Sequence, residues 1–202
     1  MGSMIARIRS RYKVKNRLIR SIYWKKKMKE IFYVEDVNRD GYLTIEELIK
    51  NTKPLQKYCN APPEKMANLE KAYHLFWGEV GLRPGKKVNK KMFLSGLNRL
   101  GRKELEREQA GKATLHSHIA NALFDIIDQN NNNKLQKEEI ANWMGAAGLD
   151  QSEAERLFDE ADHLKKGYIS REELIETEFC SFFHPEKCMQ KLGMTVVKGL
   201  WL

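Results

Sequence analysis

Apolar residues in the segment 119–127 recur at the three- and four-residue spacing of one helix face, with Leu123, Phe124 and Ile127 in register. The segment 69–77 has the composition of a second helix. Short polar segments rich in Asp, Asn, Gly and Lys lie between such helices, and the order helix, polar loop, helix occurs four times along the chain. This pattern predicts an all-α protein built from a repeated unit.

The polar loop at 36–47 carries oxygen-bearing side chains at its positions 1, 3, 5, 9 and 12, and Gly41 at position 6. This is the spacing of an EF-hand loop, in which calcium takes about 6 to 8 oxygen ligands. An acidic turn before a helix would use some of the same residues, but the complete set of constraints favours calcium. The predicted ligands are Asp36, Asn38, Asp40, the backbone carbonyl of Tyr42, Thr44 (directly or through water) and Glu47.

A similar loop occupies residues 128–139, where Asn133 replaces the usual glycine. Asparagine tolerates a positive φ better than most residues. The run of asparagines could also be low-complexity sequence, but the Asp and Glu that frame it favour a second calcium site. We expect magnesium to compete with calcium at both sites. The predicted ligands are Asp128, Asn130, Asn132, the backbone carbonyl of Lys134, Gln136 and Glu139.

Two further loops keep the frame of the repeat but lack the ligands. In the loop at 162–173, Leu164 and Lys166 stand at positions 3 and 5, where an apolar group and an ammonium group cannot coordinate a cation. The loop at 81–92 has no carboxylate at any ligand position. We therefore expect two calcium ions for four loops.

EF-hand loops pair through short antiparallel strands at loop position 8. The expected pairs are Leu43 with Val88, and Leu135 with Ile169. The predicted fold is four helix-loop-helix motifs in two pairs that form a compact bowl. The expected divisions are a basic arm at 1–21, an EF-hand pair at 22–100, a polar helical connector at 101–118, and a second pair with a C-terminal tail at 119–202.

Composition and charge narrow the possible partners and compartments. The chain has 202 residues, 42% hydrophobic content and three cysteines, which favours a monomer in a reducing cytoplasm without a disulfide framework. Eleven of its 36 basic side chains lie in the segment 5–29, which contains no acid, so the rest of the chain is nearly neutral. This basic segment suits an anionic membrane surface or an acidic partner. It also resembles a mitochondrial targeting sequence, and a solvated tail is an equal alternative. We expect no nucleic acid, because the remaining sequence indicates no basic face.

Several stretches resemble a known family when they are taken in order. They are Trp24, and the segments 76–81, 122–128 and 146–148. Together with the four loops they resemble the sarcoplasmic calcium-binding protein superfamily, and within it the calcium-regulated photoproteins and coelenterazine-binding proteins. The resemblance implies a central apolar cavity, which in photoproteins holds a peroxidised luciferin. It therefore raises the alternative of a small apolar ligand that calcium releases.

The chain departs from the photoprotein pattern at positions expected to face that cavity. Glu176 and Cys180 stand about where the family has His and Trp, and Lys27 and Met28 stand where a His would be expected. We therefore expect no photoprotein-type enzyme activity and no catalytic residue. The tryptophans could line a ligand cavity or pack as ordinary core, and the five histidines show no metal or catalytic grouping. The predicted function is an intracellular calcium sensor or buffer.

Overall fold

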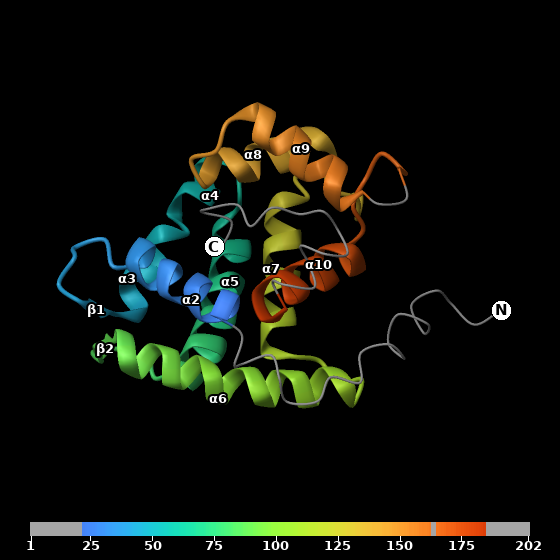
Figure 1. Ribbon diagram of the computed structural model, residues 1–202. Coiled ribbons are helices and arrows are strands. Elements are labelled where there is room, and N and C mark those ends of the chain that lie inside the picture. The colour runs from blue at the N-terminus through green and yellow to red at the C-terminus, as the bar shows by residue number, and fades with distance from the viewer. Residues whose placement is uncertain (1–21, 163–164, 185–202) are drawn as a thin grey trace.

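The computed structural model describes residues 22–162 and 165–184, and it confirms the predicted helical EF-hand fold. The predicted basic arm at 1–21, His163 and Leu164, and the end of the chain from residue 185 lie outside these residues. The helices, shown in Figure 1, are α2 (Ile22–Glu35), α3 (Ile45–Asn51), α4 (Lys53–Tyr58), α5 (Pro63–Val80), α6 (Lys90–Gln109), α7 (Leu115–Ile127), α8 (Lys137–Ala146), α9 (Gln151–Ala161) and α10 (Arg171–Phe183). The strands are β1 (Tyr42–Leu43) and β2 (Val88–Asn89).

Both predicted loop pairings are confirmed. β1 and β2 are antiparallel, and Leu43 lies opposite Val88. In the other pair, Leu135 and Ile169 form an isolated antiparallel bridge with reciprocal N–H···O bonds of 2.9 Å. All four of these side chains are buried. The loops without calcium ligands thus keep their apolar pairing residue, because it covers the partner loop's core face.

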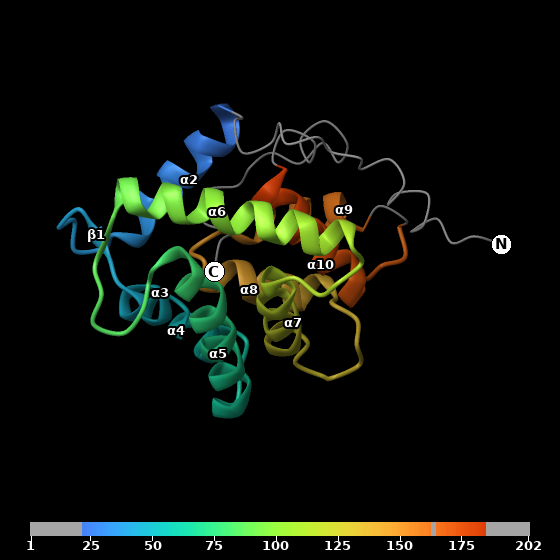
Figure 2. The ribbon, with the colours of Figure 1, turned by 90° about the horizontal axis from the view of Figure 1, so that it is seen from below.

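The centre of the molecule is built on α5 and α7, which pack side by side between the other helices (Figures 1 and 2). One apolar cluster of buried side chains extends through both EF-hand pairs. Trp24, Trp77 and Trp143 belong to it, so within the described residues the tryptophans pack as core.

The segment predicted as a polar connector contains the end of α6, the start of α7 and a buried polar contact between them. α6 runs through residues 100 and 101 without a break and ends at Gln109, and a short irregular segment leads into α7. Glu104 is completely buried. It accepts a 2.8 Å hydrogen bond from the backbone N–H of His116 and pairs with Arg107 at 2.9 Å. A carboxylate at a helix N-terminus stabilises that terminus, so Glu104 fixes the start of α7. The division of the chain at this point stays a prediction.

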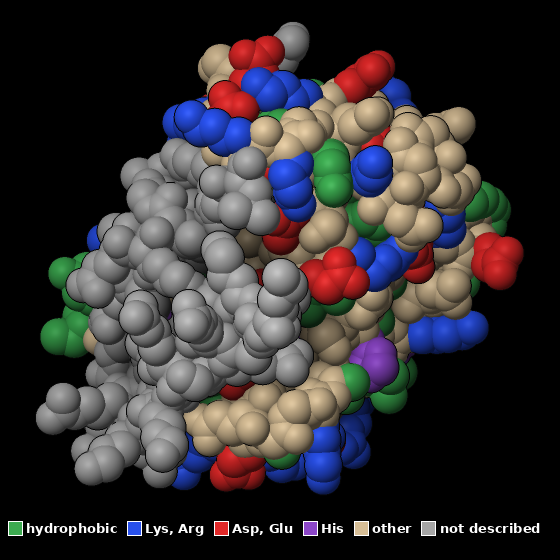
Figure 3. All heavy atoms as spheres, turned by 90° about the vertical axis from the view of Figure 1, so that its right-hand side faces the viewer, with side chains coloured by type: hydrophobic (Ala, Val, Ile, Leu, Met, Phe, Trp, Pro, Cys, Tyr) green, Lys and Arg blue, Asp and Glu red, His purple; other side chains and the backbone are tan. Residues whose placement is uncertain are grey.

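One described face of the molecule carries mixed charge. On the face opposite β1 and β2, Lys and Arg side chains alternate with Asp and Glu over the part that is described (Figure 3). Among the described residues, no helix combines the length and the apolar character that crossing a membrane requires.

Candidate calcium sites

In chain order the loops are the first (36–47), the second (81–92), the third (128–139) and the fourth (162–173). The first, third and fourth share two backbone features among their described residues. Positions 4 and 6 have a positive φ in each, which bends the loop around the place where an EF-hand holds its ion. The angles are 56° and 83° at Arg39 and Gly41, 55° and 58° at Asn131 and Asn133, and 50° and 79° at Lys165 and Gly167. Asn133 therefore adopts the conformation that glycine adopts in the other two loops.

The aspartate at position 1 organises each of these loops. Asp36 accepts hydrogen bonds from the backbone N–H groups of positions 5 and 6, at 3.2 and 3.0 Å. Asp128 makes the same pair at 3.0 and 2.9 Å, and Asp162 at 2.9 and 2.6 Å. These carboxylates are buried. The fourth loop thus keeps its aspartate for the turn although it lacks oxygen ligands at positions 3 and 5.

In the first loop, the position-12 carboxylate is turned back across the loop. Glu47 accepts bonds from the backbone N–H and the hydroxyl of Thr44, both at 2.9 Å, and from the side-chain amide of Asn38 at 2.7 Å. Thr44 caps α3 in return. Asp40 accepts a 2.9 Å bond from the N–H of Tyr42. Three of the predicted ligands, Asn38, Thr44 and Glu47, are thus in contact through hydrogen bonds to Glu47.

The third loop repeats this arrangement with more amides and fewer acids. Glu139 accepts bonds from the backbone N–H groups of Gln129 and Gln136, at 2.9 and 3.0 Å. Asn130 Oδ1 accepts from the N–H of Asn132 at 3.0 Å, and Asn132 Oδ1 accepts from the N–H of Lys134 at 2.8 Å. No group of three His, Cys, Asp or Glu side chains converges anywhere in residues 22–162 and 165–184. In the third loop, three side-chain amides and one backbone carbonyl make up most of the predicted ligands.

A lysine occupies the centre of the fourth loop. Lys166 at position 5 pairs with Glu173 at position 12, and Nζ lies 2.5 Å from Oε2. The ammonium group serves as the counter-ion of the carboxylate that calcium would bind in a functional loop. This contact supports the expectation that the fourth loop needs no metal.

Another lysine contacts a predicted ligand of the first loop. Lys87, which precedes β2 in the second loop, places Nζ 2.6 Å from Asp40 Oδ2. This bond lowers the pKa of the Asp40 carboxyl below its ordinary value. The sequence analysis missed the contact, although the pairing of Leu43 with Val88 brings residue 87 close to position 5.

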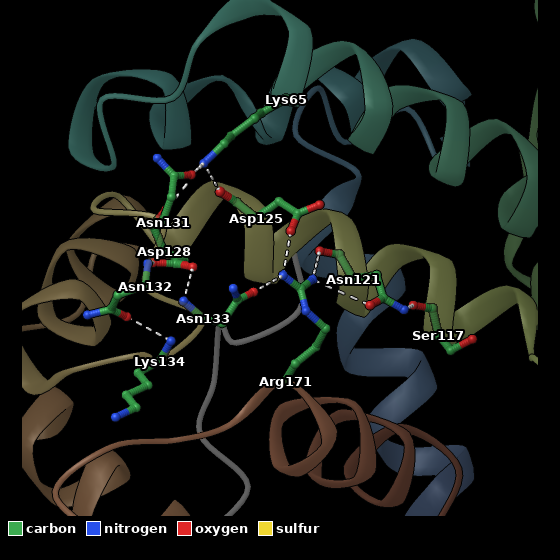
Figure 4. Close-up of polar contacts among 10 residues, drawn as sticks. All are labelled: Lys65, Ser117, Asn121, Asp125, Asp128, Asn131, Asn132, Asn133, Lys134 and Arg171. Atoms are coloured by element: carbon green, nitrogen blue, oxygen red, sulfur yellow. Dashed lines mark hydrogen bonds and ion pairs between the residues drawn. The ribbon is translucent and has the colours of Figure 1, made fainter.

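The third loop is held between two cations from other motifs (Figure 4). Lys65 of α5 donates to the backbone carbonyls of Asp125 and Asp128, the latter at 3.2 Å, and to Asn131 Oδ1 at 2.9 Å. From α10, Arg171 pairs with Asp125 at 2.7 Å and lies 4.1 Å over the ring of Phe124. Nothing in the local sequence of the loop indicates either contact, because both partners are distant in the chain.

A small cavity lies among the described residues where several helices meet. It has a volume of about 30 Å³ between α2, α5, α7 and α10, which is room for a water molecule or two. Trp77 Nε1 and His116 Nδ1 are buried in its wall, and neither has a hydrogen-bond partner among the described residues. Burial lowers the pKa of His116 to about 3, and burial raises the pKa values of Glu35 and Glu178 to about 7.

Comparison with known proteins agrees with this geometry. Residues 116–177 match the family model of an EF-hand domain pair, and residues 28–50 match that of an EF hand. Mitrocomin from Mitrocoma cellularia is 29% identical over 75% of this chain and 78% of its own length. Aequorin-2 from Aequorea victoria is 26% identical over 84% and 88%. This chain is an EF-hand calcium-binding protein related to the photoproteins.

Solved structures of the same proteins extend the relationship to three dimensions. The crystal structure of the calcium-regulated photoprotein mitrocomin covers 91% of this EF-hand protein and 95% of its own chain, with a TM-score of 0.78 and 25% identity. Calcium-loaded apo-aequorin from Aequorea victoria covers 80% and 90%, with a TM-score of 0.73 and 25% identity. An apoaequorin complex with (S)-HM-daCTZ has a TM-score of 0.77 at 23% identity, with 86% and 91% covered.

Proposed function

We propose that this EF-hand protein binds two calcium ions, at loops 36–47 and 128–139, and acts as a calcium sensor or buffer. The observation that carries the proposal is that both loops combine the EF-hand backbone and the position-1 aspartate bonds with oxygen-bearing side chains at positions 3 and 5. The fourth loop shares the backbone and the aspartate but has Leu164 and Lys166 at those positions. The first loop offers three carboxylates and the third offers two, and ligand charge raises affinity. The first site is therefore the tighter one.

The test is a calorimetric titration of the calcium-free protein. We expect two sites in the wild type. Replacement of Glu47 by Gln, or of Glu139 by Gln, removes the negative charge and one of the two coordinating oxygens of the predicted bidentate ligand, and each variant should keep a single site. Glu46→Gln, next to the ligand but exposed, is the control and should keep both. One site or four sites in the wild type would contradict the proposal.

A second candidate function is calcium-dependent release of a small apolar ligand. The unpaired Trp77 and His116 atoms in an aromatic wall favour it, and apoaequorin has been solved with a small molecule. A cavity of about 30 Å³ is smaller than an imidazolopyrazinone luciferin, so α2 and α10 would have to separate. Such a ligand should quench tryptophan fluorescence in calcium-free protein. Unchanged fluorescence at micromolar ligand would exclude this function.

We further propose that the protein does not oxidise such a ligand to emit light. The positions that depart from the photoprotein pattern support this proposal: Glu176 is exposed, and Lys27 is buried with Nζ 2.6 Å from the carbonyl of Ser181. Charging the protein with coelenterazine and adding calcium should give no flash. A flash above that of a Glu47→Gln, Glu139→Gln control would overturn the proposal.

A further inference from the structure

Exposed apolar side chains concentrate on the outer face of α2. Five of the nine large apolar side chains that are exposed in the described chain lie on this helix or directly after it. Their exposed fractions are 81% for Ile22, 62% for Tyr23, and 60% each for Tyr33, Val34 and Val37. A cluster of exposed side chains this large usually marks an interface, so this face is a candidate binding surface.

Lysines are interleaved with these apolar residues. Lys25, Lys26 and Lys29 are exposed on the same helix, where Glu30 is the single exposed acid. We call these exposed residues, from Ile22 to Val37, the α2 face. The start of α6 lies beside it (Figures 1 and 2). There Lys90 bonds the Tyr33 hydroxyl at 2.6 Å and lies 4.9 Å from its ring.

The combination of exposed apolar side chains and lysines on α2 differs from the composition of the opposite face. On the face opposite β1 and β2, cationic and anionic side chains alternate over the described part (Figure 3). In the sequence, the α2 face begins within the acid-free basic segment 5–29, and its three lysines belong to that segment. Positive charge and apolar surface therefore coincide on α2 and differ from the mixed composition seen on the opposite side.

We propose that the α2 face docks on an anionic lipid surface. Tyrosine places an apolar ring and a polar hydroxyl at the boundary between lipid and water. Lysine extends its charge to anionic headgroups while its stem covers apolar surface. A nucleic acid or an acidic protein surface would match the lysines but leave Ile22 and Val34 in water, so lipid accounts for both parts of the face.

The experiment is sedimentation of the full chain with vesicles of phosphatidylcholine alone, and of phosphatidylcholine with phosphatidylserine. Wild type should bind the anionic vesicles and lose binding as salt is raised. The charge variant Lys25→Glu, Lys26→Glu, Lys29→Glu should bind them at least about tenfold more weakly. The apolar variant Ile22→Ser, Tyr23→Ser should also bind more weakly. Melting by circular dichroism shows whether each variant is folded.

Matched controls change the same residue types elsewhere. Lys53, Lys57 and Lys71 are exposed on α4 and α5, and their replacement by Glu gives the same change in net charge. Leu75→Ser with Tyr58→Ser removes one aliphatic and one tyrosine side chain from exposed positions. Both controls should bind like wild type.

Three results would overturn the proposal. The first is equal binding to vesicles without phosphatidylserine. The second is equal loss of binding in the controls and in the variants of the α2 face, which would indicate a net-charge effect alone. The third is binding to heparin or polyglutamate, sensitive to the lysine variants, without vesicle binding, which would indicate an acidic macromolecule.

Discussion

Lys87 forms an ion pair with Asp40, a predicted ligand of the first calcium site. Its ammonium group lies 2.6 Å from Asp40 Oδ2, so calcium must displace it and then bind beside its positive charge. Replacement of Lys87 by Met removes this competitor, and the affinity of the first site should rise severalfold in a calorimetric titration. The difference should shrink as potassium chloride is added, because both partners are solvent-exposed and screened by salt.

Lys86→Met is the matched control, since Lys86 is exposed in the same loop. It removes the same charge from a neighbouring position without removing the bond to Asp40. Equal gains of affinity in the two variants would mean that general electrostatics, and not the bond to Asp40, sets the effect.

Among the elements, α5 and α6 cross at very short range. A Cβ atom added at Gly96 would lie 2.3 Å from the carbonyl oxygen of Val80 and 2.9 Å from its Cα. These are backbone atoms, so the helices would have to move apart. Replacement of Gly96 by Ala should therefore reduce the free energy of unfolding by about 1–3 kcal/mol, as measured by urea denaturation.

The control for this prediction is Gly78→Ala in α5. Gly78 is also helical, but an added Cβ would meet no atom within 4 Å. Alanine is the better helix former, so this variant should be unchanged or more stable by up to about 1 kcal/mol. Equal destabilisation of the two variants would contradict the role of close packing at Gly96.

For the whole molecule, ionisable side chains in the core make stability depend on pH. Burial raises the pKa of Glu178 to about 7, from an ordinary value of 4.5. Between these values the folded state retains a proton that the unfolded state has released, so this group's contribution to stability is lost as pH rises. Glu178→Gln should remove that loss, which gives a shallower decline in unfolding free energy between pH 5 and pH 7.

Exposed Glu176 on the same helix provides the control. Burial lowers the pKa of His116 from 6.5 to about 3, so the contribution of this group to stability increases as pH rises between those values. Because His116 is present in all three proteins, the difference from wild type isolates the contribution of the substituted glutamate. A Glu176→Gln variant with the same flattened profile would refute the assignment to Glu178.

The first calcium loop and the α2 face are adjacent in the molecule. The first loop directly follows α2, its residue Val37 belongs to the α2 face, and its residue Tyr42 is also exposed. Calcium at this loop adds two positive charges there. Calcium should therefore increase binding to phosphatidylserine vesicles, and Glu47→Gln should abolish the increase while Glu139→Gln keeps it. An equal increase in both variants would show that calcium acts on the lipid alone.

The amino-acid sequence by itself determined the fold class and the pairing of the loops. An EF-hand loop carries its turn residues, its apolar position 8 and its predicted ligands within twelve consecutive residues, so local spacing is sufficient to predict them. The pairs Leu43 with Val88 and Leu135 with Ile169 followed from the same register, and the structure confirmed them.

Only the tertiary structure decided what surrounds those loops. Lys65 reaches the third loop from more than sixty positions away, and Arg171 reaches the helix before it from fifty. Glu104 lies in a segment that composition marked as polar, yet packing buries it at the start of α7. Residue spacing encodes contacts within a loop or a helix, whereas contacts between distant charged groups depend on how the helices pack.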